Sequence, residues 1–337
     1  MDLSWTVALA GLFVGFVVGL TGMGGGALMT PMMILLFGIQ PLAAVSSDLV
    51  ASMIMKPVGG AVHLRRGTVN RTLVKWLVLG SVPSAFCGVL VLRAVGNEEA
   101  TQSVVRGALG VALLFAAAAM VAKALIDLRK TQQQQASGVV DRFAGDGSDI
   151  SVRPWPTLLV GILGGLVVGM TSVGSGSLMI VALLLLYPRL RASQLVGTDL
   201  VQAVPLVASA SLGHLLFGDF RLDLTTSLLI GALPGVYVGA RVSSSAPGGL
   251  VRRALVVVLL ASGLKLLDVG TGALVVVLAA VAVLGPLLWA TIYRAGRPKG
   301  SAASPSRLFG AAVTGRLGRP DQAADQAPDQ NSSDVPR

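Results

Sequence analysis

The chain has 337 residues, of which 53% are hydrophobic and only 12% are charged. This composition and the positive mean hydropathy exclude an ordinary soluble domain and predict a membrane protein. The net charge of +10 does not indicate nucleic-acid binding, because Lys and Arg gather in short loops and near the C-terminus, as in the cytoplasmic loops of membrane proteins. The single cysteine, Cys87, lies in an apolar stretch, so neither a disulfide framework nor a cysteine metal site is expected.

Apolar segments follow one another along most of the chain. We predict helices over 3–22, 26–38, 42–63, 72–92 and 103–124, then over 155–171, 176–187, 194–216, 224–242 and 251–267, and a last one over 271–293. Segments of about 20 residues fit the roughly 30 Å hydrocarbon core of a bilayer. The second segment of each half has only about a dozen residues, which favours a half-helix or re-entrant limb. The first segment lacks the basic start of a signal peptide, so we expect the mature protein to keep it.

Polar regions set the domain boundaries. We predict a first transmembrane repeat over 1–126, a cytoplasmic polar linker over 127–154, a second transmembrane repeat with one extra helix over 155–293, and a disordered cytoplasmic tail over 294–337. The linker is rich in Gln, Gly, Ser and Asp, as flexible loops are. The tail has too few apolar residues to bury a core.

The two halves of the chain repeat one sequence. GLTGMGGGALM at 19–29 returns as GMTSVGSGSLM at 169–179, and ten of the nineteen positions from 11 to 29 match at an offset of 150. At an offset of 151, three further residues meet identical partners: Asp48 with Asp199, His63 with His214 and Pro83 with Pro234. Internal repeats with short or Gly-interrupted segments at corresponding positions are typical of secondary transporters, whose site lies between the repeats.

Loop charges predict that the repeats are inverted. The loop after His63 carries Arg65, Arg66, Arg71 and Lys75, whereas acidic residues surround Arg221 in its counterpart. The positive-inside rule then places the first loop in the cytoplasm and the second outside, with the N-terminus outside and the C-terminus cytoplasmic. The expected fold is an all-α polytopic membrane protein with two inverted-topology repeats of about five apolar segments each, one extra C-terminal helix, and helices interrupted at Gly-rich loops.

Glycines of two kinds occur in each repeat. A stripe with four-residue spacing consists of Gly11, Gly15 and Gly19, repeated as Gly161, Gly165 and Gly169. It predicts a flat helix face for close packing, and we expect the first helices of the two repeats to pack on each other there. The consecutive glycines of GMGGG instead favour an unwound backbone with positive φ values, followed by a new helix. The bare N–H groups of such a loop bind small anions, whereas the alternative is a tight turn without a ligand.

The second loop adds hydroxyl donors to a similar backbone frame. The predicted substrate-binding residues are Thr21, Gly22, Gly24, Gly25, Gly26, Lys56, Thr171, Ser172, Gly174, Ser175 and Gly176. A dinucleotide fingerprint also fits the letters GMGGGA, but that motif follows a strand, and here an apolar helix precedes it.

Four charged or titratable positions within apolar segments are candidates for coupling or gating: Asp48, Asp199, His63 and His214. Each aspartate has three possible roles: it carries a proton, organises the glycine loops, or is an acid in the first turn of its helix that complements the helix dipole. Each histidine is expected either to act as a gate or proton relay or to cap the C-terminus of its helix. Lys56 has three interpretations: it pairs with the substrate anion, pairs with Asp48, or extends its side chain to the membrane interface.

These passages resemble the sulfite exporter TauE/SafE family of bacterial membrane proteins. The resemblance rests on GLTGMGGGALMTPMMILLFG, AVSSDLVAS, the HLRRG turn and their degenerate copies, and it covers residues 5–292. It implies a multi-pass inner-membrane carrier of small sulfur oxyanions or organosulfonates, such as sulfite or sulfoacetate, usually directed outward. It also assigns the glycine-loop region of the family to 21–26 and 171–176.

We therefore expect a secondary transporter, in the direction of export, for a small sulfur-containing anion. A carrier or channel for another small anion, such as a carboxylate, and a non-transporting membrane sensor or scaffold are the alternatives. The expected partners are the anion and the lipid bilayer, without nucleic acid, and a homo-oligomer is left open. No cofactor or metal is expected, and no nucleophile–base pair typical of an enzyme is recognisable.

Overall fold

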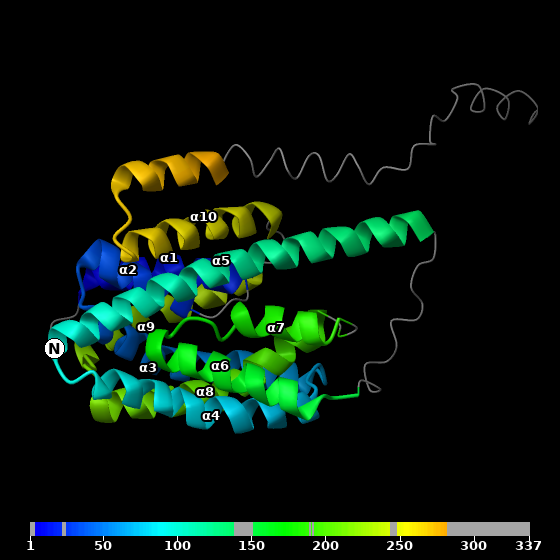
Figure 1. Ribbon diagram of the computed structural model, residues 1–337, viewed down its shortest axis with the longest axis horizontal. Coiled ribbons are helices and arrows are strands. Elements are labelled where there is room, and N and C mark those ends of the chain that lie inside the picture. Colours follow the sequence, from blue (N-terminus) through cyan, green and yellow to red (C-terminus); the bar gives the residue numbers. More distant parts are fainter. Residues whose placement is uncertain are drawn as a thin grey trace, which may run out of the picture. The chain divides into compact units, whose positions relative to one another are not determined.

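The structure is a computed structural model that describes residues 4–21, 25–137, 151–188, 190, 192–242 and 248–281. All regular structure in these ranges is helical, which confirms the predicted all-α fold (Figure 1). The helices are α1 Trp5–Thr21, α2 Gly26–Phe37, α3 Pro41–Arg65, α4 Arg71–Ala94, α5 Glu98–Ser137, α6 Pro154–Thr171, α7 Leu178–Leu186, α8 Ala192–Phe217, α9 Leu222–Val242 and α10 Gly248–Leu266. A further helix begins at Thr271 and is described as far as Val281. The rest of the predicted last helix and the predicted tail lie outside the described residues.

Five helical stretches in the described ranges are long and apolar enough to cross a membrane: Arg71–Ala94, Glu98–Ile126, Pro154–Thr171, Ser193–Phe217 and Leu222–Gly239. By contrast, α2 and α7 have 12 and 9 residues. At 1.5 Å per residue they reach only about 18 and 14 Å, well short of a roughly 30 Å hydrocarbon core. The protein is therefore a multi-pass membrane protein in which the second helix of each half is short, as predicted.

Helix α5 differs from the prediction at its C-terminal end. We expected the helix to stop near residue 124 and a flexible linker to begin at 127, whereas α5 continues to Ser137. The sequence KALIDLRKTQQQQA is rich in Ala, Leu, Lys and Gln, which have high helix propensity, so the helix extends beyond its apolar part. The remainder of the predicted linker, 138–150, lies outside the described residues.

The glycine stripes pack on fourth helices, not on each other. Helix α1 lies along α9, and α6 lies along α4. A Cβ atom placed on Gly11 would lie 2.9 Å from the carbonyl oxygen of Leu228, and one on Gly161 would lie 2.6 Å from that of Leu77. The expected pairing of the two first helices is therefore wrong. The opposing helices carry stripes of small residues of their own, and backbones approach most closely where both faces lack bulky side chains.

Exchanging the two halves of the chain maps these contacts onto one another. The pair α1–α9 becomes α6–α4, while the pairs α3–α8 and α5–α10 map onto themselves. Helices α3 and α8 run in opposite directions, because His214 near the end of α8 lies against Ser46 near the start of α3. At the other end of the same pair, Gly197 of α8 packs against His63 of α3.

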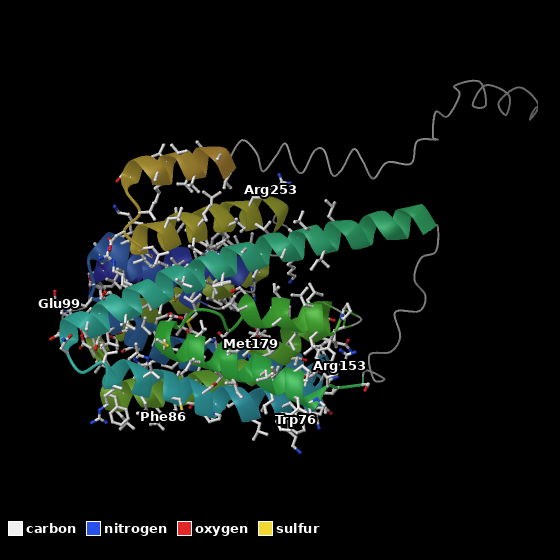
Figure 2. All side chains as sticks on the ribbon, in the orientation of Figure 1. Trp76, Phe86, Glu99, Arg153, Met179 and Arg253 are labelled. Carbon is white, nitrogen blue, oxygen red and sulfur yellow. The ribbon has the colours of Figure 1, made fainter. Side chains whose placement is uncertain are left out.

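The labelled side chains mark the ends and the interior of the bundle (Figure 2). Glu99, in the first turn of α5, and Arg153, before α6, lie at opposite ends. Met179 is buried, with 1% of its surface exposed, whereas Trp76 and Phe86 of α4 are partly exposed. Large apolar side chains also face outward, among them Phe13 and Trp155 with 69% and 76% of their surface exposed, as on a lipid-facing surface.

Candidate functional site

The backbone between α6 and α7 is unwound, as the glycine–serine sequence predicted. Ser172 has φ = 60° and Gly174 has φ = 119°, both in the left-handed region that favours glycine. Thr171, at the end of α6, donates from Oγ1 to the carbonyl oxygen of Val167 at 2.6 Å, so its hydroxyl serves the helix end. In the first loop Thr21 ends α1 and Gly25 precedes α2, whereas Gly22 and Gly24 lie outside the described residues.

The two Gly-rich loops meet. A Cβ atom on Gly26 would lie 2.8 Å from the carbonyl carbon of Ser172 and 2.9 Å from its Oγ atom, so only glycine fits there without movement. A small pocket opens beside this contact, lined by Gly26, Ala27, Ser172, Gly174, Ser175, Gly176, Ser177 and Leu259. Its cavity volume of about 10 Å³ is room for one water molecule, so the conformation is closed to a larger anion.

Lys56 brings a positive charge to this pocket from the first repeat. Its Nζ atom donates a hydrogen bond to Oγ of Ser175, and only 8% of the Lys56 surface is exposed. The ammonium group is therefore held inside the bundle and does not extend to the membrane interface. It also acts electrostatically on the carboxylates of Asp48 and Asp199.

Asp48 reaches the same loop from α3. Its Oδ2 atom accepts hydrogen bonds from Oγ1 of Thr30 at 2.9 Å and from Oγ of Ser172 at 2.6 Å. Because α3 begins at Pro41, Asp48 lies about two turns inside the helix and is not a first-turn acid. Asp48 thus connects the third helix of the first repeat with α2 and with the loop of the second repeat.

Asp199 has a different environment, although it is the repeat equivalent of Asp48. Its Oδ1 atom accepts a hydrogen bond at 3.1 Å from Nε2 of Gln202, one turn later on α8. Gln202 in turn accepts from Oγ of Ser81 on α4 at 3.4 Å. Through Gln202, Asp199 is thus linked to Ser81 of α4, whereas Asp48 is linked to Ser172 in the loop between α6 and α7.

The sequence profile of the family described as "Sulfite exporter TauE/SafE" matches residues 7–266, which run from α1 to the end of α10. The chain belongs to the sulfite exporter TauE/SafE family. The "Probable membrane transporter protein YjnA" of Bacillus subtilis (strain 168) is 36% identical over 267 residues, which are 79% of this chain and 100% of the relative. The "Probable membrane transporter protein YdhB" of the same organism is 22% identical over 261 residues, 77% of this chain and 99% of the relative. No solved structure gives a significant match.

Family and relatives together identify a membrane transporter, and the expected resemblance is confirmed. Helices α1 to α10 are the part that the TauE/SafE profile covers, so the pocket and its charged neighbours all lie within it. The helix that begins at Thr271 lies beyond the matched residues.

The two histidines are placed differently by the transporter fold. His214 is fully buried, and its Nε2 donates to the carbonyl oxygen of Gly169 at 2.8 Å. Since a carbonyl only accepts, the neutral ring carries its proton on Nε2, and Ser46 Oγ donates to Nδ1, also at 2.8 Å. His63 is only partly buried, and its Nδ1 lies 2.9 Å from Oγ1 of Thr68 in the turn that follows its own helix. His214 therefore links three helices, and His63 stabilises a local helix end.

Sequence reasoning missed several residues of this region, namely Thr30, Ser81 and Gln202. Each is a buried polar side chain inside an apolar helix, and that isolation is the signal that was available. Within the described residues, no group of three or more His, Cys, Asp or Glu side chains is placed to hold a metal ion.

Proposed function

We propose that this transporter is a secondary carrier, working in the direction of export, for a small sulfur-containing anion such as sulfite or an organosulfonate. The observation that carries the proposal is the hydrogen bond of the Lys56 ammonium to the hydroxyl of Ser175, which lines the pocket at the junction of the two loops. Sulfonate and sulfite oxygens accept hydrogen bonds and carry negative charge, which ammonium and hydroxyl groups complement. The family name supports a sulfur oxyanion.

The backbone of the loops complements these side chains. Helices α2 and α7 both begin beside the pocket, and the N-terminus of a helix has unpaired N–H groups and a partial positive charge. Anions bind at such ends. The substrate would therefore lie between the two half-helices, with Lys56 supplying the full positive charge.

Transport requires the closed pocket to open to each side in turn. Helices α3 and α8 are repeat equivalents that run antiparallel, and exchanging the two halves turns the pair α1–α9 into the pair α6–α4. Both relationships support an inverted insertion of the two repeats. In this proposal the N-terminus lies outside and the C-terminus in the cytoplasm of the bacterial inner membrane. Movement of one repeat against the other would then expose the loops alternately. Asp48, Asp199, His63 and His214 would couple or gate that movement.

The function is tested by counterflow with the purified protein in liposomes. Vesicles preloaded with unlabelled anion would be offered a labelled organosulfonate, isethionate, and competed with sulfite, methanesulfonate, acetate and chloride. We expect sulfite and sulfonates to exchange and acetate to compete at least 10-fold more weakly. Exchange of acetate in preference to sulfonates would indicate a carboxylate carrier, and no exchange of any anion would contradict transport by this site.

A further inference from the structure

One oxygen of the buried Asp48 carboxyl has no use in the fold. Oδ2 accepts two hydroxyl donors, from Thr30 and Ser172. Oδ1 is buried and has no hydrogen-bond partner among the described residues, and the whole Asp48 side chain has 0% of its surface exposed. A buried polar atom without a partner is costly, so an orphan of this kind indicates a missing proton, ion or ligand.

A protonated Oδ1 would be a donor on a carboxyl whose other oxygen is bonded to Ser172, which lines the pocket. A carboxylate that accepts through one oxygen and donates through the other can hold Thr30 and Ser172 in place and at the same time bind an anion oxygen. A deprotonated Oδ1 would instead repel that anion. The orphan atom therefore suits a carboxyl that is neutral when the substrate is bound.

The charges around Asp48 lead to the same state. Helix α2 and the loop 172–177 contain no titratable side chain. Helix α3 brings Lys56, α8 brings Asp199 and His214, α5 brings Lys123, and α9 has Asp223 and Arg241 near its ends. With His214 neutral, the two lysines balance the two buried aspartates. A bound monovalent anion then adds one negative charge, which one proton would neutralise.

The second repeat lacks the parts needed for the same role. The positions equivalent to Thr30 and Ser172 are Ile180 and Gly22, and the position equivalent to Lys56 is Val207. Asp199 has instead Gln202 as its donor. Among the described residues, two hydroxyl donors to one carboxyl oxygen and an orphan second oxygen occur together at Asp48 and not at Asp199.

Resting on the function proposed above, we propose that Oδ1 of Asp48 carries one proton together with each monovalent anion. The proton enters from the side on which the anion binds, is donated to an anion oxygen while the anion is bound, and leaves on the other side. Asp199 does not carry it. Transport of a monovalent sulfonate is then electrically neutral.

The test uses the full chain in liposomes that contain a pH-sensitive dye, with isethionate as the anion. Isethionate stays ionised near neutral pH, so a proton that moves with it is moved by the protein. We expect wild type to move about one proton per anion and to be insensitive to a potential set by potassium and valinomycin. In Asp48→Asn the amide nitrogen donates where the protonated oxygen would, and its oxygen still accepts from Thr30 and Ser172. This variant should exchange isethionate with a proton ratio near zero and become voltage-sensitive.

Asp223→Asn, at an exposed aspartate in the first turn of α9, is the matched control and should keep the wild-type proton ratio. A proton ratio in Asp48→Asn equal to that of wild type would overturn the inference, as would sodium-driven uptake. If the variant does not fold, the measurement on wild type still tests the inference. Voltage-driven isethionate uptake by wild type without proton movement contradicts the inference and leaves the proposed function intact. Absence of any anion exchange by wild type would contradict both.

Discussion

Lys56 and Ser175 lie 119 positions apart in the chain, yet Nζ of Lys56 donates a hydrogen bond to Oγ of Ser175. This bond joins the third helix of the first half to the Gly-rich loop of the second half. The equivalent positions are Val207 and Gly25, which cannot form such a bond. The ammonium group and the hydroxyl group thus occur in only one of the two equivalent helix–loop contacts, and the two Gly-rich loops are chemically unequal.

Replacing Lys56 by Met tests the role of the buried charge. The variant keeps the length of the side chain but loses the ammonium group, so we expect anion affinity to fall roughly 10- to 100-fold, the equivalent of a charge-assisted hydrogen bond of about 1.5–3 kcal/mol. The measurement is the concentration dependence of isethionate exchange in liposomes. Lys75→Met, which removes an exposed cation on α4, is the control and should leave that affinity unchanged. An unaltered affinity in Lys56→Met would exclude Lys56 from the anion site.

Replacing Gly26 by Ala tests the contact between the loops. The added methyl group would overlap the backbone of Ser172 and force the loops apart. Such overpacking costs about 1–3 kcal/mol, and a displacement of about 1 Å at a site can reduce its rate roughly 100-fold. We expect exchange to be reduced at least 10-fold at normal expression. In Gly107→Ala, where no atom lies within 4 Å of the added methyl group, both exchange and stability should be retained. Equal activity of the two variants would show that the loops tolerate separation.

The helices and their interruptions could be predicted because apolar runs and consecutive glycines act locally. The partner of the glycine stripe could not, because a stripe specifies a flat face without specifying its partner. The sequence held a usable clue: Gly231, Gly235 and Gly239 form a second stripe with the same spacing on α9. Two stripes in each repeat indicate that a first helix packs on a fourth helix, and the structure shows that the two helices belong to different halves.

The loops and the charged residues of the candidate site could be predicted from the sequence, but the hydrogen bonds between its side chains could not. Asp48 and Asp199 look equivalent in the sequence, and their difference arises from Ser172 and Thr30, which fold against Asp48 from distant positions. Contacts of this kind depend on tertiary packing, which the pattern of a single segment does not encode. Buried hydroxyl and amide side chains within apolar helices were the signal that could have indicated them.

The proposed inversion of the repeats predicts opposite exposure of two equivalent loops. In a Cys87→Ala background, Arg66→Cys and Arg221→Cys each replace an exposed arginine between the third and fourth helices of a repeat. We expect a membrane-impermeant maleimide to label Arg221→Cys in intact cells and Arg66→Cys only after lysis. The two variants control for each other, because both remove one positive charge. Labelling of both positions from the same side would rule out an inverted arrangement.

Replacing each histidine by Ala compares the contribution to stability of a hydrogen bond between helices with that of a hydrogen bond within one turn. His214→Ala removes the hydrogen bonds to Ser46 and to the carbonyl oxygen of Gly169 and leaves both groups buried without that partner. The expected loss is about 1–3 kcal/mol, visible as a lower midpoint of thermal unfolding in detergent. His63→Ala is the matched control from the other repeat and should change the midpoint far less, because His63 is partly exposed and, among the described residues, its side chain bonds within its own turn. Equal shifts in the two variants would show that the link through His214 adds no more to stability than the local bond of His63, and a difference confined to transport would favour a gate.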